Sequence, residues 1–154
     1  MVFKSDSGLD KAKKVVEGVL KSLGISPDDN VSGGVEGGCG WHVARGSADV
    51  LISLIPPQGG AAGRLRVVSP IVRLDGELPL GLTTRLLSLN GTDLPGVAFG
   101  IVSGNLVVLV AERSVTALDR SEVEEILHHI GFYADKYDDL LVNEFGGVRV
   151  CDIA

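Results

Sequence analysis

The residues best suited to chemistry in this sequence are Cys39 and His42, which stand three positions apart with Trp41 between them. A cysteine and a histidine can act as nucleophile and base, or as two ligands of a zinc ion. A zinc site needs further ligands, and no second Cys/His pair stands at ligand spacing. A nucleophile needs rigid support, whereas glycines surround Cys39. We therefore expect no metal, no cofactor and no catalytic residue, and keep as the alternative a small-molecule sensor or an enzyme with a site near Cys39, Trp41 and His42.

Three further patterns match catalytic or nucleotide-binding motifs only in part. The glycine-rich stretch 33–40 lacks both the Gly-Lys-Ser/Thr of a phosphate loop and the spacing of a dinucleotide fingerprint. His128 and His129 are adjacent, so on a helix their side chains point about 100° apart and do not easily share one ion. Asp138 and Asp139 are neighbours in sequence rather than carboxylates on two sides of a cleft. The sequence therefore predicts that the protein is not an enzyme.

Composition narrows the class of protein further. A length of 154 residues fits one domain, 1–154. The formal net charge of -6 argues against nucleic acid as a partner, because phosphate binding needs clustered lysine and arginine. No apolar run reaches the ~20 residues of a membrane span, and two cysteines make no disulfide framework. We therefore expect a cytoplasmic protein that contacts neither a membrane nor nucleic acid.

Hydrophobic periodicity predicts an α+β fold with an antiparallel sheet and the order α-β-β-β-α-β-β-α. The middle helix is expected to end at Asn90-Gly91 in a left-handed C-cap, and the last helix to begin at a capping box between Asp119 and Glu122. Pro70 has no amide hydrogen, which indicates a sheet edge or a bulge at that point. The first helix is expected over residues 7–23, and the strands over 41–45, 48–55, 64–74, 97–102 and 106–111.

The last two strands form a hairpin around Ser103-Gly104-Asn105, and both of its faces are apolar. Such strands lie in the middle of a sheet or in an interface, so a partner surface is expected and with it a homodimer. One face is expected to carry Val97, Phe99, Ile101, Leu106, Val108 and Val110, and the other Ala98, Gly100, Val107, Leu109 and Ala111. The residues expected at the dimer interface are Leu86, Leu89, Phe99, Ile101, Leu106 and Val108.

Three segments carry a resemblance to a known fold. They are Leu86-Leu87-Ser88-Leu89-Asn90 in the middle helix, the hairpin from Phe99 to Leu106, and Ala134-Asp135-Lys136-Tyr137 in the last helix. With the order of elements, they resemble the type III secretion chaperone-like fold of class I effector chaperones and of the YbjN-type proteins described as bacterial sensory-transduction regulators. The glycine-rich stretch 33–40 departs from the pattern and leaves the limits of the first strand open.

The resemblance implies a homodimer with the middle helix and the adjacent hairpin at the seam. It also implies a protein or peptide client, because class I chaperones hold an extended effector segment against apolar patches and sheet edges. The residues expected to form the peptide-binding patch are Val15 and Val19 of the first helix with Leu51, Ile55 and Val68 of the sheet.

Overall fold

The computed structural model describes residues 7–153. It confirms the expected order of helices and strands and adds a two-residue strand near each end. The elements are α1 (Ser7–Ser22), β1 (Val31–Ser32), β2 (Cys39–Arg45), β3 (Ala48–Ile55), β4 (Arg64–Arg73), α2 (Leu80–Thr92), β5 (Ala98–Val102), β6 (Leu106–Ser114), α3 (Arg120–Phe145) and β7 (Val148–Arg149). Short 3-10 helices cover Asp28–Asn30 and Val150–Asp152.

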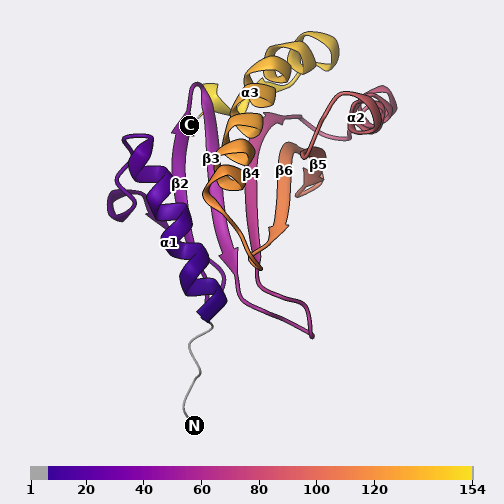
Figure 1. The fold of residues 1–154 in the computed structure, drawn as a ribbon. Coiled ribbons are helices and arrows are strands. Elements are labelled where there is room, and N and C mark those ends of the chain that lie inside the picture. The colour runs from indigo at the N-terminus through magenta and orange to yellow at the C-terminus, as the bar shows by residue number, and fades with distance from the viewer. Residues whose placement is uncertain (1–6, 154) are drawn as a thin grey trace.

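All strands belong to one antiparallel sheet in the order β1-β2-β3-β4-β6-β5, and β7 pairs with β4 outside this path. Figure 1 shows α1 and α3 in front of the same face of the sheet, whereas α2 lies to the side, next to β5. We call the face under α1 and α3 the covered face and the opposite one the open face. No helix within the described residues lies over the open face in this view.

The core forms between the covered face and the helices because the strands alternate with period two. In β3, for example, Val50, Ile52 and Leu54 are completely buried. The apolar stripe of α1 packs against them, with Val16 and Leu20 fully buried. The helices thus cover one of the two faces of the sheet. Their apolar sides pack in the core of the protein.

Pro70 lies at a β-bulge in the interior of the sheet, as its missing amide hydrogen predicts. The register of β4 against β6 shifts between Pro70 and Val72. The hydroxyl of the buried Ser69 donates a hydrogen bond to the carbonyl oxygen of Asp49 at 2.7 Å, which ties β4 to β3 beside the bulge.

The expected capping box starts α3. The backbone N–H of Glu122 donates to Asp119 Oδ1 at 2.9 Å, and the backbone N–H of Asp119 donates to Glu122 Oε2 at 2.9 Å. The bond from the N–H of Glu122, together with one from the Ser121 hydroxyl, lowers the pKa of the Asp119 carboxyl. At the other end, α3 stops at Gly146, whose backbone N–H donates to the carbonyl oxygen of Val142 at 2.8 Å.

Asp138 is a charged side chain in the buried part of α3, only 7% exposed. Burial raises the pKa of its carboxyl, although one carboxylate oxygen accepts a hydrogen bond from the N–H of Asp139. Between the unfolded and the folded pKa the folded state binds more protons, so the free energy of unfolding falls as pH rises through this window.

We expect Asp138→Asn to remove this pH-dependent penalty. The gain in the free energy of unfolding over the unaltered protein should grow as pH rises from 3.8, the ordinary pKa of an aspartate, to above the raised pKa of Asp138. Urea denaturation across this range measures it. Asp93→Asn, at an exposed position after α2, serves as the control. A gain that shrinks as pH rises would contradict the prediction.

Candidate binding surfaces

The faces of the β5–β6 hairpin differ from those expected. Val102 pairs with Leu106 and Phe99 pairs with Leu109, so residues of equal parity lie opposite each other. The reason is the three-residue turn, because an odd number of turn residues keeps odd-numbered positions of both strands on one face. The predicted assignment of Leu106, Val108 and Val110 to the face of Phe99 is therefore wrong. The covered face carries Val97, Phe99, Ile101, Val107, Leu109 and Ala111, and the open face carries Ala98, Gly100, Val102, Leu106, Val108 and Val110.

The covered side of the hairpin packs within its own subunit. Phe99 is buried and meets the ring of Tyr137 of α3 edge-on, with 5.4 Å between the ring centroids. Leu86 and Leu89 of α2 are also buried in this core. Three of the residues expected at the dimer interface thus lie in the core of the subunit. Their side chains are too buried to contact a second copy directly.

The open face carries an apolar row that crosses four strands. Leu51 of β3 pairs with Val68 of β4, Val68 pairs with Val110 of β6, and Val110 pairs with Ala98 of β5. Leu51 is 37% exposed. We call this row and its apolar neighbours the open sheet surface. Its members are Leu51, Ile55, Val68, Pro70, Ala98, Val102, Leu106 and Val110; Val108, expected at the dimer interface, lies on the same face but is buried.

Charged residues border the open sheet surface at one end. Arg64 and Arg66 of β4 both contact the carboxylate of Glu112 on β6, Arg64 at 3.4 Å. All three side chains are partly exposed. This cluster holds one more positive than negative charge, so the border favours an acidic group on anything that covers the apolar row.

The expected peptide-binding patch is split by the sheet. Leu51, Ile55 and Val68 lie on the open face, whereas Val15 and Val19 lie on α1 on the other side. Val19 is fully buried and Val15 packs against the core. No single ligand segment can contact all five side chains at once.

A second candidate surface is a groove between α2 and β5. Its volume is about 240 Å³, and Leu87 and Ile101 stand at its rim. Leu87 is 72% exposed although it lies on a helix packed against the core. We call this depression the α2–β5 groove. Its lining is Thr83, Leu86, Leu87, Asn90, Phe99, Gly100 and Ile101.

Asn90 closes part of the sheet edge within this groove. Its side-chain nitrogen donates to the carbonyl oxygen of Phe99 at 3.1 Å, and its side-chain oxygen accepts from the N–H of Phe99 at 2.7 Å. The expected helix end at Asn90-Gly91 is wrong, since α2 continues to Thr92. The Asn90 side chain instead forms its hydrogen bonds with Phe99 of β5. The amide therefore occupies the backbone groups that an added strand would use at this position.

Asn90→Ala is expected to lower the free energy of unfolding by about 1–3 kcal/mol, because it leaves two backbone groups of Phe99 without their partner. Urea denaturation measures the loss. Ser88→Ala, at an exposed position of the same helix, is the matched control and should change stability by no more than about 0.5 kcal/mol. Equal effects of the two substitutions would show that the Asn90 amide has no such role.

The opposite edge of the sheet remains partly open. β1 pairs with β2 only at Gly40 and Trp41. Within residues 7–153, no strand pairs with residues 42–45 on that side of β2. Backbone groups at this edge can therefore receive an extended segment.

The alternative site near Cys39, Trp41 and His42 is not assembled. Trp41 is 1% exposed in the core, whereas His42 points to the open face, where its Nε2 lies 3.2 Å from the Asp49 carboxylate. Cys39 is half-buried, and burial raises the pKa of its thiol, which keeps the reactive thiolate scarce. Within the described residues, no group of three or more His, Cys, Asp and Glu side chains is placed to hold a metal ion.

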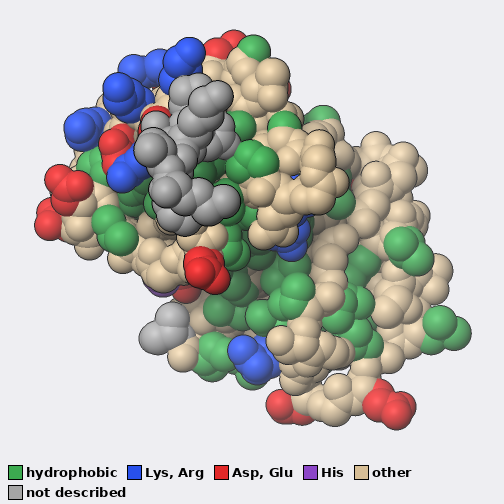
Figure 2. Space-filling view, turned by 90° about the horizontal axis from the view of Figure 1, so that it is seen from below, with side chains coloured by type: hydrophobic (Ala, Val, Ile, Leu, Met, Phe, Trp, Pro, Cys, Tyr) green, Lys and Arg blue, Asp and Glu red, His purple; other side chains and the backbone are tan. Residues whose placement is uncertain are grey.

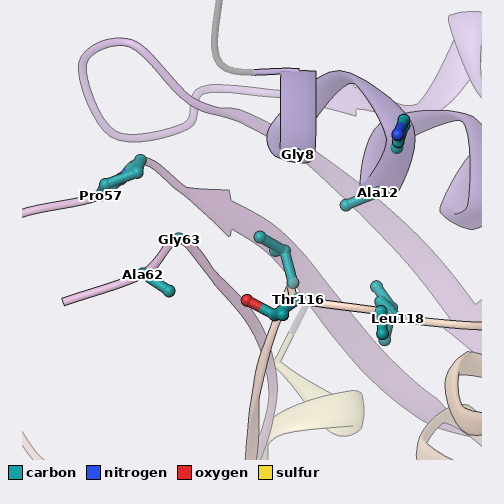
Figure 3. Close-up of a pocket in the computed structure, with 10 residues that line it drawn as sticks. Gly8, Ala12, Pro57, Ala62, Gly63, Thr116 and Leu118 are labelled. Carbon is teal, nitrogen blue, oxygen red and sulfur yellow. The ribbon is translucent and has the colours of Figure 1, made fainter.

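A third depression, of about 480 Å³, lies where α1 approaches two loops. Figure 3 shows Ala12 of α1, Gly63 of the β3–β4 loop and Thr116 of the β6–α3 loop around it. The guanidinium of Arg113 fixes the last loop, since it donates to the carbonyl oxygen of Thr116 at 2.7 Å and to Glu122 at 2.8 Å. The lining comes from separate segments, so no local pattern in the sequence marks this depression.

The surface near this depression combines charge and apolar character. In Figure 2, lysine and arginine side chains gather at one corner and hydrophobic side chains lie across the centre of the view. The exposed side of α1 carries four lysines, Lys11, Lys13, Lys14 and Lys21.

Among residues 7–153, every helix is too short or too polar to span a membrane.

Comparisons with known proteins identify the fold. No family model and no curated protein matches this chain. The structure of the ExsC–ExsE complex contains a chain that is 20% identical, with a TM-score of 0.61 over 86% of this chain and 95% of that one. The HopA1–SchA chaperone–effector complex contains another, 14% identical, with a TM-score of 0.56 over 86% and 96% of the two chains. The chain therefore has the type III secretion chaperone-like fold.

Proposed function

We propose that the protein is a homodimer that binds a polypeptide client in the manner of a secretion chaperone and performs no chemistry. The open sheet surface carries this proposal, because apolar side chains of four adjacent strands lie side by side there without a helix above them. Burial of apolar surface is the main favourable contribution to most protein association. The similar structures support the proposal, since each is a complex of two proteins and one is a chaperone–effector complex.

In this proposal two copies meet across the α2–β5 groove. Leu87 and Ile101 supply exposed apolar side chains on either side of it. A two-fold axis beside the groove brings the same side chains of both copies together. Asn90 already occupies the backbone of Phe99, so the subunits join through side chains rather than by continuing one sheet at this position.

The client lies in an extended conformation on the open sheet surface. Leu51, Val68 and Val110 form the apolar floor for its side chains. Residues 42–45 of β2 offer backbone groups for strand addition at the nearby edge. The Arg64–Arg66–Glu112 cluster favours an acidic residue in the segment that reaches it.

Affinity capture from the native lysate followed by mass spectrometry tests the client. The unaltered protein and Lys14→Glu, changed on the exposed side of α1, should retain the same polypeptide in near-stoichiometric amount. Leu51→Glu places a charge in the apolar row and should reduce that recovery by about tenfold or more. Equal recovery by both variants would place the client elsewhere.

A further inference from the structure

The C-terminal segment fills a gap in the sheet that β3 leaves. β3 lies beside β4 from Arg64 to Val68, and the β2–β3 turn at Gly46-Ser47 makes it too short to reach the end of β4. Beyond the bulge, β7 takes over on the same side of β4, where Arg149 pairs with Val72 and Val148 pairs with Arg73. In Figure 1 the yellow C-terminal segment reaches the upper ends of β2 and β3. We call this position beside Val72 and Arg73 the β4 slot.

Two features fit the segment to the β4 slot. Gly147 has a φ of 86°, and a Cβ there would stand 2.6 Å from the carbonyl oxygen of Arg73, so only glycine allows this close approach. Cys151 closes over the buried Asp138, and the cavity that remains between them and the bulge is only about 10 Å³. The slot therefore fits two extended residues, Val148 and Arg149, followed by the 3-10 helix Val150–Asp152.

Arg149 gives the slot its chemical preference. Its guanidinium lies 2.9 Å from the carboxylate of Asp139 on α3 and also contacts Asp152 within the tail. Asp135 and Asp138 add further carboxyl groups on the same stretch of α3. The slot thus combines a pairing edge with an acidic wall, and an arginine between two valines occupies it.

The segment is held by few interactions. Only two residues pair with β4, Val148 is 41% exposed, and the Asp139 side chain is 70% exposed. An exposed ion pair is screened by salt and contributes little to stability. Segments with so few buried contacts open locally without unfolding the rest of the protein.

We propose that the β4 slot is a strand-binding site occupied by the protein's own tail, which an extended segment of a partner polypeptide replaces. The partner segment carries an arginine between two β-branched residues, as residues 148–150 do. Backbone pairing with Val72 and Arg73 holds the segment, and Asp139 selects the arginine. This site borders the open sheet surface at Pro70 and Leu106 but shares no residue with the α2–β5 groove, so it stands without the homodimer.

The test uses the full chain and a defined probe, a labelled peptide with the sequence of residues 146–153 and serine in place of cysteine. Arg149→Glu releases the tail by repulsion from Asp139, and Asp139→Ala releases it from the other side of the contact. Arg120→Glu is the control, because the ion pair that Arg120 forms within residues 7–153 is with Glu124, four positions further along α3. Hydrogen exchange at residues 72–73 and 148–150 reports release, and fluorescence anisotropy reports peptide binding.

Both release variants should exchange these amides at least about tenfold faster than the control, but only Arg149→Glu, which keeps Asp139, should bind the peptide at least about tenfold more tightly. A peptide with glutamate in place of its arginine should bind to neither variant. Unchanged amide exchange in both variants, or faster exchange in Arg149→Glu without peptide binding, overturns the proposal. If the peptide instead dissociates a dimer of the unaltered protein, the slot holds the tail of a second copy and the assignment to a partner polypeptide is wrong.

Discussion

Leu87→Asp is expected to convert the protein from a dimer into a monomer at micromolar concentration. Leu87 is the most exposed side chain of the α2–β5 groove, and in the proposed dimer it is buried against the second copy. Loss of a central apolar contact with burial of a charge costs about 2–4 kcal/mol. Because a two-fold interface contains the residue twice, the dimer dissociation constant should rise by roughly a thousandfold or more.

Light scattering coupled to size-exclusion chromatography measures this effect. Ser88→Asp adds the same charge at the next residue of α2, at an exposed position outside the groove lining, and should remain dimeric. Circular dichroism confirms that both variants are folded. A monomeric unaltered protein, or dissociation by both variants alike, would contradict the proposed dimer across the α2–β5 groove.

Trp41→Ala is expected to have the largest effect on stability of any single substitution in β2. The indole is completely enclosed between the covered face and the helices, so its removal leaves a large cavity. Replacement of a buried aromatic side chain by alanine costs about 3–5 kcal/mol. In a protein of this length the melting temperature should fall by roughly 10 °C.

The neighbouring residue gives the matched comparison. His42 is exposed on the open face, and its ion pair with Asp49 is partly exposed, so His42→Ala should cost no more than about 1 kcal/mol. Thermal and urea denaturation of both variants provide the measurement. If Trp41→Ala left stability unchanged, Trp41 would not be a core residue. That result would favour the alternative hypothesis of a ligand or active site near Cys39, Trp41 and His42.

Much of the fold follows from local patterns in the sequence. Alternating apolar residues in 48–55 and 64–73 place two strands correctly, and the three-residue turn after Val102 forms the hairpin as expected. The capping box at Asp119 and the glycines after Phe145 fix both ends of α3. These signals are local, so one sequence is sufficient to identify them.

The candidate surfaces depend on relations that no local pattern contains. Which residues of the hairpin share a face depends on the register, and the odd turn length was the one local sign of it. Asn90 matches a helix C-cap in sequence, but a tertiary contact with Phe99 determines its role. The β4 slot depends on the length of β3 relative to β4, which becomes visible only when the strands are paired.

Photo-crosslinking in the native cell tests most directly whether the open sheet surface binds a polypeptide. A photoreactive phenylalanine analogue replaces Leu51 on the open face or, as the control, the exposed Phe132 on α3. Position 51 should form an adduct with a polypeptide other than this chain, and position 132 should form no such adduct. Adducts from position 132 alone, or from position 51 only to a second copy of this chain, would contradict this prediction.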